Sequence, residues 1–253
     1  MINFKTLSMS VLLSLITFNG YTDDAPITDI MQKINADMRE TRKNAGFNPD
    51  GGVTVTPSSE IHAPSNVKSQ WVKERLEQRK NGYLSVYNDR AKELLQLGDI
   101  LQFKYNASLK NKDKNSSIFR KTNSEINMGY TFTPVPEHYV SNVYGFASCN
   151  TFKDGWTGIV EFFKSEGVGN CAFTENNVSL THQAAKVDES IVRYDINEKI
   201  TVVSVEGNKD SGYLYKVDWF DKDFFRTLEC ASMDYSVDET NAVINLATKI
   251  DMK

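Results

Sequence analysis

The sequence predicts an α+β protein whose C-terminal antiparallel β-meander is packed with helices and is preceded by a helical N-terminal region. Four apolar runs separated by short turn-rich segments indicate the meander: residues 190–194, 200–205, 212–220 and 224–231. In the third run, alternate residues form one apolar face: Tyr213, Tyr215, Val217 and Trp219. Because 17 of the 28 aromatic residues lie between Tyr130 and Phe225, we expect the core to be C-terminal.

Residues 1–22 are predicted to be a signal peptide. Lys5 precedes an apolar run at residues 9–18, which is too short to span a bilayer, and Asp23 and Asp24 follow soon after. We expect cleavage between residues 20 and 25; the alternative is a buried N-terminal helix. The first cysteine is Cys149, so an N-terminal lipid-modified cysteine is not expected. The predicted location is extracytoplasmic, either periplasmic or secreted.

The charge balance argues against nonspecific binding to nucleic acid or to anionic membranes. Removal of Lys5 with the signal peptide leaves 28 basic residues against 33 acidic ones. No later apolar run reaches the roughly 20 residues that a membrane-spanning helix needs. No transmembrane helix is therefore expected after cleavage.

Residues 23–66 are predicted to form a helical arm followed by a flexible linker. Five apolar residues at helical spacing give the arm a narrow stripe: Ile27, Ile30, Met31, Ile34 and Met38. A helix this short is only marginally stable alone, so the stripe should pack on something else. Methionine suits adaptable surfaces, which favours a protein partner, although docking on the chain's own C-terminal domain remains an alternative. Proline, glycine and serine between residues 47 and 66 predict the linker.

Residues 67–253 are expected to form a single α+β domain, with a helical part at 67–98 and a β-rich core at 127–253. Gly82 is placed to divide the helical part into two helices. Trp156, Ile159, Val160 and Phe163 fit a helical template, so we predict a short helix over residues 155–165. A capping box at Ser236–Glu239 starts a predicted terminal helix that should close over the meander.

Three cysteines in an oxidising compartment allow one intramolecular disulfide. Cys149 and Cys171 flank the predicted helix at 155–165, and this pair is favoured. If residues 155–165 form a strand instead, Cys149 and Cys171 lie at opposite ends of it. Cys230 is then the better partner for either one.

The sequence contains no recognised catalytic, cofactor or metal-binding motif. His62, His138 and His182 are far apart and show no metal-ligand spacing, so no metal site is expected. Cys171, His182 and Asp188 contain the residue types of a nucleophile, a base and an orienting acid, but no family signature surrounds them. No catalytic residue is assigned, and no cofactor is expected.

Three functions remain open at this level. The favoured hypothesis is a noncatalytic module of a cell envelope or secretion assembly that binds a protein partner through the arm. The second is a secreted enzyme or effector with a site near Cys171 and His182. The third is a protein that binds a small ligand or a glycan.

Overall fold

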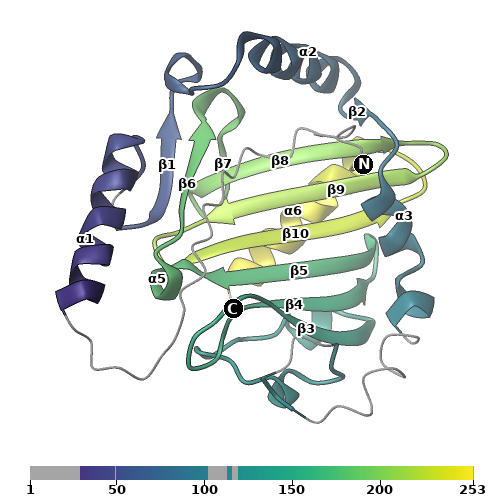
Figure 1. Cartoon of the computed structure of the whole chain (residues 1–253). Coiled ribbons are helices and arrows are strands. Elements are labelled where there is room, and N and C mark those ends of the chain that lie inside the picture. The colour runs from purple at the N-terminus through teal and green to yellow at the C-terminus, as the bar shows by residue number, and fades with distance from the viewer. Residues whose placement is uncertain (1–28, 49, 102–112, 116–118, 253) are drawn as a thin grey trace, which may run out of the picture.

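The protein has an α+β fold built on a large, mostly antiparallel sheet (Figure 1). The structure is a computed structural model, and it describes residues 29–48, 50–101, 113–115 and 119–252. The predicted signal peptide, residues 1–22, lies outside the described residues. Along the main path of the sheet the strand order is β2-β8-β9-β10-β5-β4-β3, and β7 also pairs with β8. A separate two-stranded parallel sheet contains β1 and β6.

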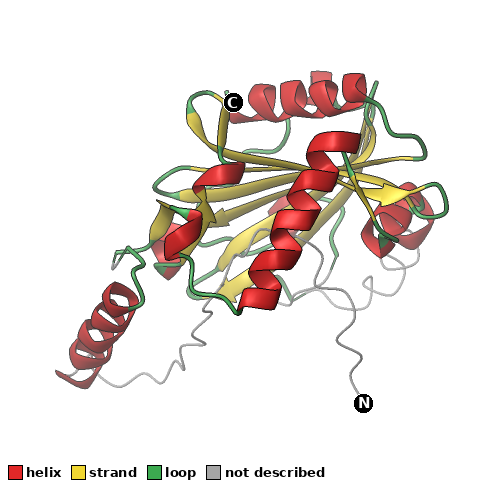
Figure 2. Cartoon of the chain, turned by 90° about the horizontal axis from the view of Figure 1, so that it is seen from above, coloured by secondary structure: helices red, strands yellow, loops and turns green. Residues whose placement is uncertain are grey.

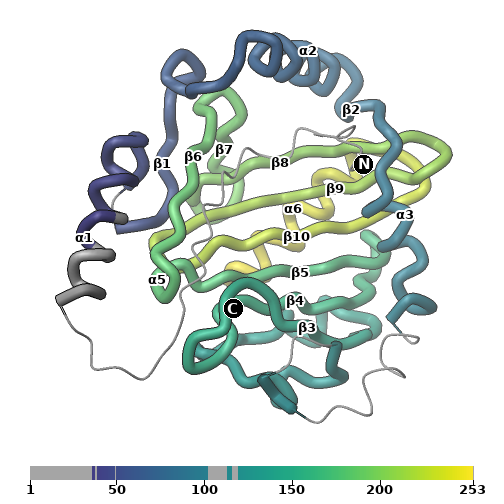
Figure 3. The backbone as a smooth tube through the Cα atoms, viewed as in Figure 1, coloured from purple at the N-terminus to yellow at the C-terminus, as the bar shows by residue number. Residues whose placement is uncertain are grey.

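Two three-stranded meanders lie side by side to make the centre of the large sheet (Figure 3). The first contains β3 (Asn142–Phe152), β4 (Trp156–Ser165) and β5 (Gly169–Asn177). The second contains β8 (Lys199–Asn208), β9 (Gly212–Phe220) and β10 (Phe224–Ser232). They join where β5 and β10 pair antiparallel. The second meander corresponds to the last three of the four apolar runs in the sequence. The first run, residues 190–194, is a strand only at its end, because Ser190 and Ile191 lie in a 3-10 helix and β7 (Arg193–Ile196) begins after it.

Helix α6 (Val237–Asp251) covers one face of the sheet, as predicted. Its N-cap forms, since the Glu239 amide donates to Ser236 Oγ at 3.0 Å. The other half of the predicted capping box is replaced, because the Ser236 amide donates to the Tyr215 hydroxyl at 2.9 Å. Apolar residues on one helix face, including Val243 and Ile250, are fully buried against the sheet. Their partners on the sheet include Phe173 and Trp219, whose rings stack 5.8 Å apart. The main core therefore lies between α6 and the two meanders.

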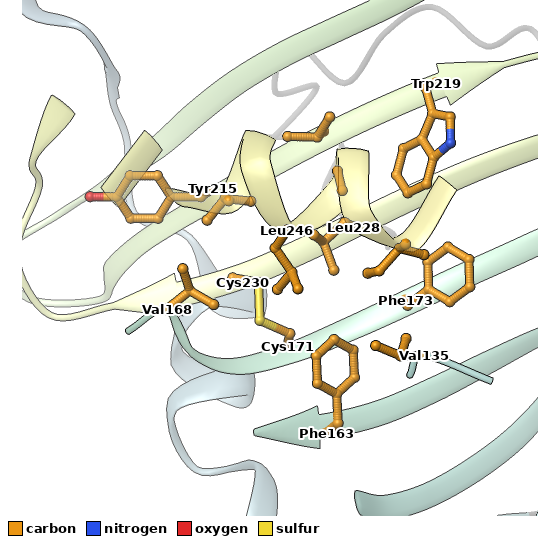
Figure 4. Packing of buried hydrophobic residues seen from close by; sticks show 14 of the residues in the cluster. Val135, Phe163, Val168, Cys171, Phe173, Tyr215, Trp219, Leu228, Cys230 and Leu246 are labelled. Atoms are coloured by element: carbon orange, nitrogen blue, oxygen red, sulfur yellow. A yellow bond between two sulfur atoms is a disulfide. The ribbon is translucent and has the colours of Figure 1, made fainter. Parts of the chain in front are cut away.

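The disulfide joins the two meanders at the middle of this core (Figure 4). Cys171 on β5 and Cys230 on β10 are directly opposite each other in the register, with their Cα atoms 4.1 Å apart. Both residues are completely buried. The favoured pairing of Cys149 with Cys171 is therefore wrong, and Cys149 is a free thiol.

The cause of that error is the segment 155–165, which forms strand β4 and not a helix. Its alternate residues, from Thr157 to Ser165, are buried, as in a strand with one face on the core. One of these positions is Glu161, a charged residue at a core position, which hides the alternation in the sequence. Its carboxylate accepts a hydrogen bond from the Val135 amide at 2.8 Å. Since β4 is the strand between β3 and β5, it separates Cys149 from Cys171.

The carboxylate of Asp251, the last residue of α6, connects the end of this helix to the sheet. The carboxylate of Asp251 lies 2.6 Å from Lys199 Nζ and accepts hydrogen bonds from Asn197 at 2.7 Å and from the Trp219 indole at 3.0 Å. Burial on its own would raise the pKa of Asp251, but these hydrogen bonds and the Lys199 charge hold it below its ordinary value. The ionised form of Asp251 therefore stabilises the fold.

The N-terminal region contains helix α1 (Asp29–Asn44) and strand β1 (Gly52–Thr56). Helix α1 stands to the side of the large sheet in both views (Figures 1 and 2). Strand β1 pairs in parallel with β6 (Ala184–Asp188), so the predicted linker is ordered at this point. The alternation of Val53 and Val55 with threonine was the sequence signal for this strand, but its proline- and glycine-rich surroundings concealed it.

Helix α3 (Asp89–Leu95) covers part of the opposite face of the sheet. Helix α2 (Ser65–Asn81) ends at Gly82, and the two-residue strand β2 (Leu84–Ser85) leads into α3. The predicted break at Gly82 is thus confirmed. Helix α3 lies on the face opposite α6 (Figure 1), where Leu94 packs in a cluster with Leu214 and Ala231. Helix α2 runs past the β8 end of the sheet (Figure 1).

Candidate functional site: an arginine-lined groove

A groove of about 320 Å³ lies at the β8 edge of the sheet. Its walls are α2, the segment 190–193, the middle of β8 and the first turn of α6, which contributes Thr240. This volume is at the lower end of the range for pockets that bind small ligands. The groove is therefore the right size for a small group or for a short stretch of a larger partner.

Helix α2 presents one polar face to the groove. The lining residues Arg75, Gln78, Arg79 and Gly82 are spaced i, i+3, i+4 and i+7, which places them on the same side of a helix. Gly82 has φ +83°, and a Cβ at this position would clash with the ring of Tyr235. Glycine therefore lets the chain turn away from the helix while α2 stays close to the start of α6.

Strand β8 contributes four consecutive residues to the lining, Val202 to Val205. Side chains of an extended strand alternate between the two faces of a sheet. Four neighbours line one cavity only when that cavity runs along the edge of the strand. The pairing of β8 agrees: on this edge β7 pairs at Thr201 and β2 pairs from Glu206 onward. Between these two positions, β9 is the only strand that pairs with β8 in the part of the chain that the structure describes.

Arg75 is held in place by an ion pair. Its Nη1 lies 2.6 Å from Asp188 Oδ2 and donates to Ser190 Oγ at 2.8 Å. Burial on its own would raise the pKa of Asp188, but hydrogen bonds from Ser58, Ser190 and Arg75 keep it below its ordinary value. The pair is mostly shielded from water, with exposed side-chain fractions of 17% and 11%. Arg75 thus ties α2 to the end of β6.

The other two arginines are more accessible. Arg193 on β7 contacts Asp195 through Nε, at 2.5 Å, and its side chain is about half exposed (51%). Arg79 is exposed, and within the described part of the chain no carboxylate forms an ion pair with it. A guanidinium carries five N–H donors, so one carboxylate leaves donors unused. Arg79 and Arg193 can therefore bind an incoming anion.

The electrostatic character of the groove follows from this inventory. Its lining includes three arginines and, among the described residues, no carboxylate. The apolar lining residues Ile191, Val192 and Val203 provide a surface beside the charges. Guanidinium groups bind carboxylates and phosphates in bidentate geometry. The arrangement suits a ligand that combines an anionic group with a short apolar portion.

A second cavity, of about 400 Å³, lies between residues 138–141, the turn after β4 and α6. Its cation is already used: Lys249 Nζ lies 5.1 Å from the centre of the Tyr139 ring. Ser165 Oγ donates to the Tyr139 carbonyl at 2.7 Å. These contacts hold the cavity walls together, so it is the weaker candidate.

The residues that the sequence suggested for catalysis do not converge. Cys171 Sγ is bonded to Cys230 and is buried, so it is not a free nucleophile. His182 is exposed beyond the other end of β5, after the short helix α5 (Val178–Thr181). About six strand residues, or about 20 Å, separate Cys171 from that end. Asp188 is engaged by Arg75 at the groove.

The remaining thiol is also a poor nucleophile. Burial raises the pKa of Cys149 to about 12, so the thiol stays protonated at neutral pH. Its Sγ lies 3.6 Å from the side-chain oxygen of Asn176. Cys149 is therefore packed in the structure, not presented for reaction.

The predicted docking stripe on the arm falls outside the described part of the structure. Ile27 precedes the described residues. For Ile30, Met31, Ile34 and Met38, the description covers the backbone of α1 and not the side chains. The C-terminal end of the helix is fastened to the body, since Lys186 Nζ donates to the Ala45 carbonyl at 2.6 Å.

Sequence reasoning missed the groove because charges on a helix indicate an exposed face. Arg75 and Arg79 lie in a stretch of interleaved acidic and basic residues, which is typical of a solvated surface. Their i, i+4 spacing with Gln78 and Gly82 was the available signal for a polar face. Nothing in the sequence places that face beside the edge of β8, which lies more than 100 residues later.

Comparison of the chain with family models, with curated proteins and with solved structures found no match. In the described part of the chain, no helix is long and apolar enough to cross a membrane. Within the same residues, no cluster of three or more histidine, cysteine or acidic side chains is arranged to hold a metal ion.

Proposed function

We propose that the protein is an exported, noncatalytic interaction module of the cell envelope, and that its groove binds an anionic group on a partner protein. The observation that carries this proposal is the set of three arginines beside an incompletely paired strand edge. The groove offers binding groups, and the engaged Cys171 removes the nucleophile on which the enzymatic alternative rested.

Export is supported by two independent features. The sequence begins with the pattern of a signal peptide, with a short apolar run and a polar continuation. The buried disulfide between Cys171 and Cys230 is of the kind that forms and persists in oxidising compartments. A periplasmic or secreted location fits both features.

The arm supplies a second surface for the same role. Helix α1 stands apart from the sheet (Figure 2), and the prediction that its apolar stripe docks on a partner remains part of the proposal. Within the arm, α1 is the part that can be removed without disturbing the folded body. Strand β1 pairs with β6, and Ser58 donates to Asp188 at 2.6 Å, so residues beyond α1 belong to the folded body.

Native purification from the envelope fraction of the source cell tests the proposal. Wild-type protein should retain a stoichiometric partner after mild chemical cross-linking. The double variant Arg79→Gln/Arg193→Gln should lose the partner, because both accessible cations are removed. The control Lys80→Gln removes the charge of an exposed residue that does not line the groove, and it should retain the partner. Deletion of residues 29–44 should weaken capture without unfolding the body.

Four results would contradict the proposal. Recovery of the protein from the cytosol with Met1 intact would exclude export. Capture that is the same for wild type and for the double variant would exclude the groove. A purified monomer that turns over a substrate would favour the enzymatic alternative, and saturable binding of a free sugar in the groove would favour the glycan-binding one.

A further inference from the structure

We infer that the partner's anionic group belongs to an extended acidic peptide, which binds by adding a strand to the free edge of β8. This inference rests on the proposed function and specifies its ligand. It depends on an observation that a simple anion site does not need, namely that the groove follows the main chain of β8 through Val202 to Val205.

Among the residues that the structure describes, the edge of β8 is paired at both ends and open between them. Strand β7 pairs antiparallel up to Thr201, and β2 pairs in parallel from Glu206 (Figure 1). In a β-strand, successive residues direct their main-chain groups to alternate sides. Two of the four residues in the gap therefore direct N–H and C=O groups toward the groove. Proteins usually cover or pair such groups, because an open edge is a template for another strand.

The dimensions of the open edge match a short segment of peptide. Four residues of a strand cover about 13 Å, and an added strand would lie about 4.8 Å from β8. The C-terminal half of helix α2 forms the far wall of the groove. A peptide between α2 and β8 would satisfy the main-chain groups of β8 on one side. On its other side it would meet Arg79.

The charges select the composition of the peptide. Arg79 lies on the α2 wall without a carboxylate partner among the described residues, and Arg193 stands at the β7 end of the gap. Acidic side chains on the peptide would pair with these guanidinium groups. Alternate residues of an added strand that share a face with Val203 would meet this apolar side chain, which favours apolar β-branched residues at those positions.

A displayed library of random seven-residue peptides, panned on the folded protein, tests the composition. The selected sequences should contain acidic residues alternating with β-branched ones. They should bind Arg79→Gln at least about tenfold more weakly, which is the usual effect of losing one charge-assisted hydrogen bond. The matched control, Lys80→Gln, should bind as wild type does. Failure to enrich any peptide, or enrichment of sequences without acidic residues, would overturn the inference.

Main-chain pairing is tested separately on the best selected peptide. Hydrogen exchange at residues 202–205 should slow when the peptide binds, whereas exchange within β10, which is paired on both sides, should stay the same. Methylation of alternate peptide nitrogens should abolish binding in one register and leave it intact in the other. Binding that is indifferent to methylation in both registers would overturn strand addition.

Inorganic phosphate separates failure of this inference from failure of the proposed function. If phosphate competes with the partner through Arg79, while no peptide protects residues 202–205 from exchange, the groove is an anion site and strand addition is excluded. If neither the partner nor phosphate depends on Arg79, the proposed function itself fails.

Discussion

The middle of the sheet and its β8 edge are built from the same kind of strand but differ in what surrounds them. At the middle, β5 and β10 have a neighbour on both sides, and α6 covers them with a mainly apolar core. At the edge, no second described strand pairs with β8 over residues 202–205, and the facing helix offers arginines. The comparison indicates that stability is concentrated at the centre, while binding capacity lies at the edge.

The largest expected effect comes from removing the central disulfide. Cys171 and Cys230 are 59 residues apart in the sequence, and closing a loop of that length is worth about 4 kcal/mol in the chain-entropy model. We expect Cys171→Ala/Cys230→Ala to lower the free energy of unfolding by about that amount, measured by urea denaturation. The control Cys149→Ala should change it by less than about 1 kcal/mol, because Cys149 forms no disulfide. If the double variant and Cys149→Ala lose the same free energy of unfolding, the disulfide does not contribute the expected stability.

The next effect concerns the fastening of α6 and depends on pH. Asp251→Asn should lower the free energy of unfolding by about 2 kcal/mol at pH 7, since hydrogen bonds to a charged group are lost. The pKa of Asp251 is lower in the folded state, so this contribution is complete above the unfolded pKa of about 3.9 and disappears as the pH falls through the folded value. The difference between wild type and variant should therefore vanish in strong acid.

Urea denaturation across the acid range measures this difference. The control is Asp210→Asn, since Asp210 is exposed and lies in a turn, where asparagine is also accepted. The free energy of unfolding of this variant should follow that of wild type across the acid range. If the difference in the free energy of unfolding between wild type and Asp251→Asn stays constant below pH 3, the lost interaction is packing and not charge.

The sequence predicted those parts of the fold in which local pattern and tertiary environment agree. In β9 the apolar residues at alternate positions, such as Tyr215, Val217 and Trp219, belong to the core beneath α6. The Ser236 hydroxyl accepts a hydrogen bond from the Glu239 amide three residues later, which is a local contact. Strand β4 was mistaken for a helix because Glu161 occupies a core position, where only the fold supplies a partner for the carboxylate. The disulfide prediction failed with it, since the register of β5 on β10 decides which cysteines meet.

The groove was beyond sequence analysis for a related reason. It forms between α2 and β8, and the gap in β8 exists only because two short strands, β7 and β2, pair at its two ends. Each of these pairings involves very few residues and leaves almost no pattern. Whether one side of a strand is unpaired depends on the neighbouring strands, and the sequence of the strand itself does not show its neighbours.

A smaller effect on stability should separate the two arginines of α2. Arg75→Gln leaves Asp188 without its cation in a shielded position, and we expect the free energy of unfolding to fall by about 1.5 kcal/mol. Below about pH 4 this loss should shrink, because the pKa of Asp188 is also lowered in the folded protein. Thermal or urea unfolding at pH 7 and pH 3 measures both values. No loss at pH 7 would mean that the ion pair does not tie α2 to the body.

The smallest effect is expected at Arg79, and it is the sharpest test of the comparison between centre and edge. Arg79 is exposed on α2 and forms no ion pair among the described residues, so Arg79→Gln should alter the free energy of unfolding by less than about 0.5 kcal/mol. Glutamine keeps a helix propensity close to that of arginine, which removes the backbone from the comparison. If unfolding is unchanged while partner capture is lost, the residue serves binding alone. A drop as large as that of Arg75→Gln would instead make Arg79 part of the fold, and the edge would no longer differ from the centre.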